Sequence, residues 1–122
     1  METTVQHPEQ LQYAEVYISD MLILKNIFLE TQNTQKVNTD FGVPFLLAKK
    51  NSQVISFASL IIHDKGEITF RVYDKKGMTE TEKKNFIFRA ETYFKKNNTP
   101  NFRNTEQLKN SIYRMTRWLN LS

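Results

Sequence analysis

The fold is decided by residues 45–94, which read FLLAKKNSQVISFASLIIHDKGEITFRVYDKKGMTETEKKNFIFRAETYF. Three runs rich in β-branched and aromatic residues lie in or beside this stretch, at 43–48, 54–62 and 67–73. Because polar segments separate them, we predict an antiparallel meander of three strands. In the third run Ile68, Phe70 and Val72 alternate with the other residues, which predicts one buried face. The middle run is apolar on both faces, as in a central strand covered on both sides.

A buried helix is predicted before these strands. Pro8 suits a first helical position, and apolar residues between Leu11 and Leu29 recur at intervals of three, four and seven. The Gln, Asn and Thr residues from Thr31 to Asp40 favour local side-chain bonding, so we expect a polar loop or short irregular helix there.

Two more helices are predicted after the strands. Thr79 followed by Glu82 is a capping-box pattern that opens the first of them. Its inward residues are Phe86, Ile87, Ala90, Tyr93 and Phe94. This helix should end near Asn97, ahead of Pro100. The last helix is marked by apolar residues at intervals of four, three and four: Leu108, Ile112, Met115 and Leu119.

Length and composition indicate a single folded domain, 1–122. The chain has 39% hydrophobic residues and only 3 Gly and 3 Pro, unlike a disordered chain. It has no Cys, which excludes a disulfide scaffold and thiolate chemistry, and its two histidines have no metal-ligand spacing. The first residues lack a signal-peptide pattern, and no apolar run approaches the ~20 residues that span a bilayer, so we expect a cytoplasmic protein without a membrane segment.

The charge of +4 is unevenly distributed. Residues 1–70 hold 5 Lys and Arg against 8 Asp and Glu, whereas residues 71–122 hold 12 against 5. Such asymmetry marks either a solvated basic helix face or a surface for nucleic acid or an acidic protein. The basic residues come with four aromatic ones, Phe88, Tyr93, Phe102 and Trp118, as stacking surfaces require. No recognised nucleic-acid motif is present.

The order helix, loop, three antiparallel strands, basic turn, helix resembles the central part of the GNAT acyltransferase superfamily. Residues 45–50 and 54–62 are similar to the hairpin of that family. The resemblance covers about half of the chain and implies an α+β fold, an antiparallel sheet of three or more strands covered by helices, as in a shortened GNAT domain. It also implies acetyl-CoA as cofactor.

In that family the cofactor pyrophosphate lies on a glycine-rich loop between the fourth strand and the next helix, where backbone N–H groups are accessible. The resemblance places this loop at Lys75, Lys76, Gly77, Met78 and Thr79. Of the family's glycines only Gly77 remains, and Glu80 and Glu82 occupy the first helical turn, where like charge opposes a phosphate. The cofactor loop is therefore degenerate.

Two catalytic residues are implied by the same resemblance. Tyr113 matches a tyrosine that protonates the departing thiolate, and Glu67 matches a base that removes a proton from the acceptor amine. Each has a simpler interpretation: Tyr113 as an aromatic residue on a helix flank, and Glu67 as a turn residue that pairs with a lysine across strands.

The sequence thus leads to two functional hypotheses. The first is a degenerate N-acetyltransferase-like protein, weakly active or non-catalytic, that binds an acyl-CoA or another small ligand. The second is a small basic module that contacts nucleic acid or an acidic protein. Because the chain has 9 Phe and 5 Tyr, we also expect apolar surface that a homodimer would cover.

Overall fold

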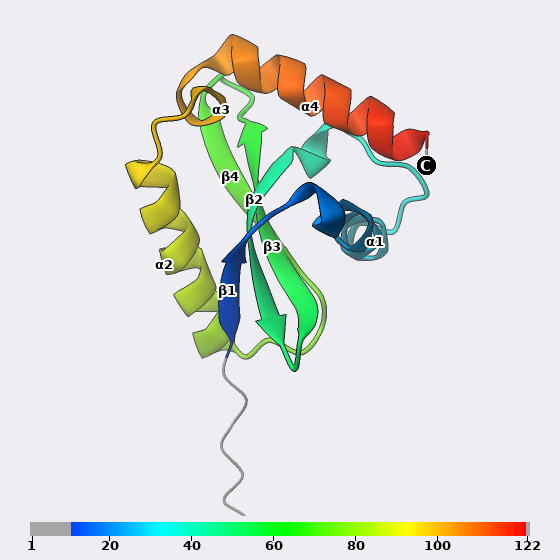
Figure 1. The fold of residues 1–122 in the computed structure, drawn as a ribbon, viewed down its shortest axis with the longest axis vertical. Helices are drawn as coiled ribbons and strands as arrows, with labels where there is room; N and C mark the ends of the chain where they lie inside the picture. Colours follow the sequence, from blue (N-terminus) through cyan, green and yellow to red (C-terminus); the bar gives the residue numbers. More distant parts are fainter. Residues whose placement is uncertain (1–10, 122) are drawn as a thin grey trace, which may run out of the picture.

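The computed structural model describes residues 11–121, which form an antiparallel sheet covered by helices (Figure 1). The strands are β1 (Gln12–Glu15), β2 (Val43–Lys50), β3 (Gln53–Ile62) and β4 (Ile68–Asp74), in the order β1-β2-β3-β4. The helices are η1 (Ile18–Asp20), α1 (Met21–Gln32), η2 (Thr39–Phe41), α2 (Glu80–Lys96), α3 (Pro100–Arg103) and α4 (Thr105–Asn120). The predicted α+β class and meander are confirmed. Within residues 11–121 no helix has both the length and the apolar content to cross a bilayer.

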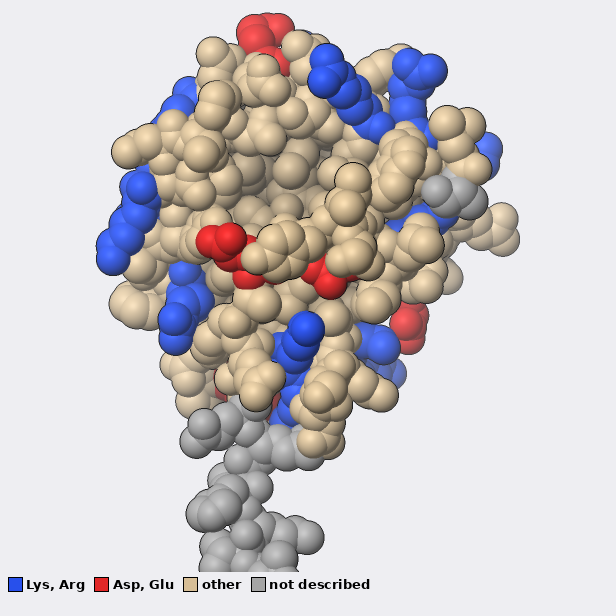
Figure 2. Space-filling view, in the orientation of Figure 1, with Lys and Arg blue, Asp and Glu red and all other residues tan. Residues whose placement is uncertain are grey.

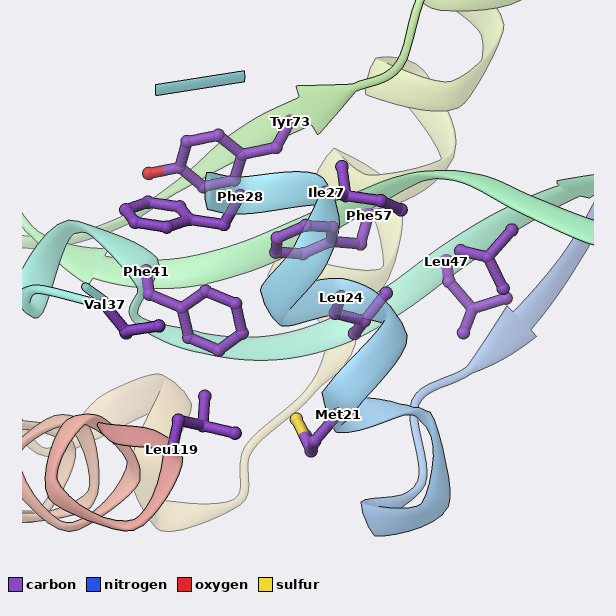
Figure 3. Packing of buried hydrophobic residues seen from close by; sticks show 11 residues of the cluster. Met21, Leu24, Ile27, Phe28, Val37, Phe41, Leu47, Phe57, Tyr73 and Leu119 are labelled. Atoms are coloured by element: carbon purple, nitrogen blue, oxygen red, sulfur yellow. The ribbon is translucent and has the colours of Figure 1, made fainter. Parts of the chain in front are cut away.

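Two apolar clusters fill the two faces of the sheet. The first lies between the sheet and α1 (Figure 3) and contains Met21, Leu24, Ile27, Phe28, Val37, Phe41, Leu47, Val54, Phe57, Tyr73 and Leu119. The second lies on the side of α2 and contains Phe45, Leu46, Ala48, Ala58, Leu60, Phe86, Ala90, Phe102, Leu108 and Ile112. Since β3 supplies Phe57 to one cluster and Ala58 to the other, the prediction that the middle strand is covered on both sides is confirmed.

Residues 12–15 form a strand, so the prediction of a helix across this segment was wrong. They pair in antiparallel register with residues 46–49 of β2. Pairing with the edge of β2 satisfies backbone groups, which outweighs an apolar spacing of three and four. The helical turns begin only where the Tyr17 N–H donates to the Asp20 carboxylate at 2.8 Å. The predicted start at Pro8 lies outside the described residues.

β4 differs from its prediction at Tyr73. The alternation placed Tyr73 with Thr69 and Arg71 on the face away from the buried set, yet Tyr73 is 3% exposed. α1 covers that face, and the Phe28 ring lies edge-on to Tyr73 with 5.2 Å between centroids. Burial raises the pKa of the Tyr73 phenol, whose hydroxyl donates to the Asp40 carbonyl oxygen. Near its carboxyl end, β4 is therefore covered on both faces.

The helices after β4 follow the sequence pattern closely. The residues predicted inward and found buried are Phe86, Ala90, Leu108, Ile112 and Leu119. Ile87 is 40% exposed, because it lies about 100° around the helix from Phe86. Pro100 occupies the start of α3, a single turn, so the segment 99–102 adds no fifth strand beside β4.

Gly42 forms the corner between η2 and β2. Its φ is +68°, and a Cβ at this position would lie 2.0 Å from the Leu60 carbonyl oxygen. Beside it, the buried Ser59 hydroxyl donates to the Phe41 carbonyl oxygen. Only glycine combines this backbone conformation with such a close approach, so the corner holds η2 against the sheet.

We predict that Gly42→Ala destabilises the protein by about 3 kcal/mol, because the new methyl group forces the corner away from β3. Urea unfolding followed by circular dichroism measures this loss. Gly66→Ala is the matched control: Gly66 also has a positive φ of +86°, but no atom lies within 4 Å of its Cβ position. It should cost about 1 kcal/mol. Equal losses would show that close packing at Gly42 is not the constraint.

Candidate functional site

The start of α2, where the resemblance places the cofactor loop, is held by the chain's own side chains. The Thr79 hydroxyl accepts from the Glu82 N–H at 3.0 Å, and the Glu82 carboxylate accepts from the Thr79 N–H at 2.9 Å. Lys50 lies 3.3 Å from the same carboxylate. The Thr79 N–H bond, followed by Lys50, holds the pKa of Glu82 below its usual value. The predicted capping box is confirmed, and a carboxylate already lies at the helix start.

The backbone conformation explains why residue 77, between β4 and α2, is a glycine. Gly77 has φ +124°, in the region that favours glycine, and no atom lies within 4 Å of its Cβ position. Lys75 and Lys76 are exposed, and the Lys75 N–H donates to the Ile55 carbonyl oxygen at 2.8 Å. Met78 is half-buried against the second cluster. The turn geometry alone is enough to require Gly77.

The two predicted catalytic residues belong to the other end of the sheet. Glu67 is exposed in the β3–β4 turn, where its carbonyl oxygen accepts from the His63 N–H at 2.7 Å. Tyr113, on α4, lies beside Ile61 and Ile62 at the carboxyl end of β3. Residues 75–79 follow the far end of β4, and seven strand residues span about 20 Å. The structure therefore does not bring the predicted cofactor loop and the predicted catalytic residues together.

Tyr113 instead lines a hollow of about 300 Å³ between η2, the end of β3 and α4. Its lining residues are Thr39, Asp40, Ile61, Ile62, Lys109, Ile112 and Tyr113. Ile61 and Ile112 are buried, while Asp40, Lys109 and Tyr113 are exposed. The hollow thus has an apolar floor with a carboxylate, an ammonium and a phenol at its opening, the usual composition of a ligand site.

The outer surface of α4 continues from this hollow. Its exposed side chains include three cations and two aromatic rings, here called the α4 face: Lys109, Arg114, Arg117, Tyr113 and Trp118. The Arg117 guanidinium lies 5.7 Å from the centroid of the Tyr113 ring, and this ring is 61% exposed. In Figure 2, Lys and Arg side chains stand over α4, at the upper right of the molecule.

Three of the cations of α2 and α3 have partners within the chain. Lys83 pairs with Asp74, and Lys95 pairs with Glu91, each at 3.5 Å. Arg103 donates to three backbone carbonyl oxygens at the end of α2. Within residues 11–121, by contrast, none of the three cations of the α4 face forms an ion pair. The α4 face is therefore a basic surface with charge available to a partner. Lys75, Lys76, Lys84 and Lys96 are also exposed and form no ion pair within residues 11–121, but they lie outside this face.

Thr39 and Asp40 are not predicted as site residues from the sequence, because they lie in a segment interpreted only as a polar loop. Their positions depend on the glycine corner, which a single sequence does not reveal. Three or more metal-ligating side chains do not cluster anywhere in residues 11–121. No protein-family model, curated protein or solved structure matches this chain, so the functional conclusion rests on the geometry alone.

We predict that Glu82→Gln destabilises the protein at pH 7, because it removes the charge that Thr79 N–H and Lys50 stabilise. The lowered pKa means that this stability is present above the ordinary value of 4.5 and is lost as pH falls through the lower folded value. Urea unfolding at pH 7 and at a series of lower pH values should therefore show a difference from wild type that is largest at pH 7 and shrinks as pH falls below 4.5.

Glu80→Gln removes the same charge from the same helical turn and serves as the control. Within residues 11–121 Glu80 forms no ion pair or side-chain hydrogen bond, so its variant should lose less stability at pH 7. Identical losses for both variants would contradict a specific role of Glu82 at the start of α2.

Proposed function

We propose that this chain is a non-catalytic binding module, built on a shortened acyltransferase-like fold, that holds single-stranded nucleic acid on the α4 face. The observation that carries the proposal is the combination of cations without carboxylate partners and exposed rings on the exposed half of one helix, from Lys109 on one flank to Trp118 on the other. Single-stranded nucleic acid is bound by such surfaces because cations attract the phosphates while bases stack on aromatic rings.

The aromatic part of the surface favours nucleic acid over an acidic protein. Tyr113 and Trp118 are 61% and 42% exposed, and both lie on the helix that carries Arg114 and Arg117. An acidic peptide would use the cations but has no flat ring system to stack on these side chains. Stacking on a single aromatic ring contributes about 1–3 kcal/mol per base, comparable with the electrostatic contribution of a few phosphate contacts.

Two features weigh against a cofactor-dependent reaction. The Glu82 carboxylate accepts the Thr79 N–H at the start of α2, where a pyrophosphate would have to bind. The residues implied as catalytic, Tyr113 and Glu67, lie at the opposite end of the sheet. We therefore expect no heat on calorimetric titration with millimolar acetyl-CoA, and clear saturable heat would restore the acyltransferase hypothesis.

We predict that a fluorescent single-stranded oligonucleotide binds this protein with strong salt dependence. Three phosphate contacts give a slope of log K against log salt of about −2, equivalent to about a twentyfold loss of affinity between 50 and 200 mM salt. The double variant Arg114→Ala/Arg117→Ala should bind more weakly, with a slope near −0.7, as measured by fluorescence anisotropy.

The control removes the same charge elsewhere. Lys76→Ala/Lys84→Ala changes two exposed lysines at the opposite end of the molecule and should leave affinity and slope close to wild type. No binding at low salt, or equal weakening by both double variants, would refute the α4 face as the binding surface. Competition by poly-glutamate as efficient as that by unlabelled oligonucleotide would favour the acidic-protein alternative.

The homodimer stays a prediction, and one surface would suit it. Four exposed apolar side chains lie close in sequence, at the N-cap and start of η1 and at the start of α1: Tyr17, Ile18, Leu22 and Ile23. Exposed apolar side chains that gather in one patch are typical of an interface. Light scattering at high concentration should show a dimer that Leu22→Glu dissociates, and a monomeric wild type would refute it.

A further inference from the structure

The hollow beside Tyr113 has room for one small planar ligand. Its volume is about 300 Å³, and Ile61, Ile62 and Ile112 form its apolar floor. The Tyr113 ring at its opening belongs to the α4 face, so a strand bound on that face passes the mouth of the hollow. Single-stranded nucleic acid is commonly read by turning one base into such a pocket between apolar and aromatic side chains.

The polar side chains at the opening are available to a ligand. The backbone of Asp40 is held on both sides, because its N–H donates to the Asn38 side chain at 2.9 Å and its carbonyl oxygen accepts from Tyr73. Its carboxylate forms no hydrogen bond or ion pair within residues 11–121, and neither does the Lys109 ammonium. Asp40 thus presents two acceptor oxygens, and Lys109 presents donors.

These groups match one base better than the others. The Watson–Crick edge of guanine carries two adjacent donors, N1–H and N2–H, next to the O6 acceptor. A carboxylate accepts both donors at once, and an ammonium donates to O6. Adenine offers one donor beside an acceptor, uracil has one donor between two acceptors, and cytosine has one donor beside two acceptors. In each of these cases a carboxylate oxygen would face an acceptor.

We propose that the hollow is a pocket for a guanine base, with Asp40 on N1–H and N2–H, Lys109 on O6 and Tyr113 against the ring. As a pocket for a base within a strand, it rests on the proposed nucleic-acid binding. Guanine in a free nucleotide has the same edge, so the two sources are separated by experiment.

The test uses four fluorescent octanucleotides that are oligo-U except for a single central G, A, C or U, measured by anisotropy at low salt. Wild type should bind the G strand at least about tenfold more tightly than the others, since one bidentate base contact discriminates between bases by about this factor or more. Asp40→Asn should abolish this preference, because an amide NH₂ then faces the guanine donors. Asp64→Asn, the same change in the exposed β3–β4 turn, should retain it.

The outcomes separate the two proposals. Equal binding of all four strands overturns the guanine pocket and leaves the α4 face intact. If no strand binds, the proposed function fails, and the pocket is decided by thermal shift with millimolar GMP and AMP. A shift with GMP alone, lost in Asp40→Asn, then supports a free-nucleotide site. No shift, or equal shifts with GMP and AMP, overturns the pocket.

Discussion

The close approach of Gly42 to the Leu60 carbonyl oxygen is the constraint on which the rest of the structure depends. It brings η2 onto the sheet, where the Phe41 ring joins the first cluster and packs against Phe28 and Phe57. The same corner fixes Asp40 at the edge of the hollow, directly after the loop that follows α1. A backbone contact that any side chain would break therefore sets both the core and the candidate site.

The two ends of the sheet have different chemistry. At the start of α2 some charges are satisfied internally, since Glu82 is bonded by Thr79 and Lys50, and Lys83 pairs with Asp74. At the other end, the charged groups at the hollow and along α4 have no such partners within residues 11–121. The Glu82 carboxylate thus occupies the helix start where a cofactor pyrophosphate would have to bind, whereas the α4 face lies at the other end of the sheet. The proposal of an anionic chain as ligand therefore rests on the α4 face and not on the start of α2.

Much of the fold could be predicted because its determinants are local. The alternation at Ile68, Phe70 and Val72 and the Thr79–Glu82 box depend on neighbouring residues, and both segments form as expected. The segment of β1 was predicted as a helix because its apolar spacing fits one. Only its pairing with β2 shows that it is a strand. The site was harder to predict: Tyr113 was identified through a resemblance, whereas Asp40 enters it through contacts with Tyr73 and the corner, which join residues distant in sequence.

The most direct test of the central claim is an amide chemical-shift titration of ¹⁵N-labelled protein with a single-stranded oligonucleotide, because it locates the binding surface without any substitution. The account predicts that the largest shifts cluster on α4 and η2, around Lys109, Tyr113, Arg117 and Asp40. Shifts concentrated on residues 75–83 at the start of α2, or no shifts at low salt, would contradict it.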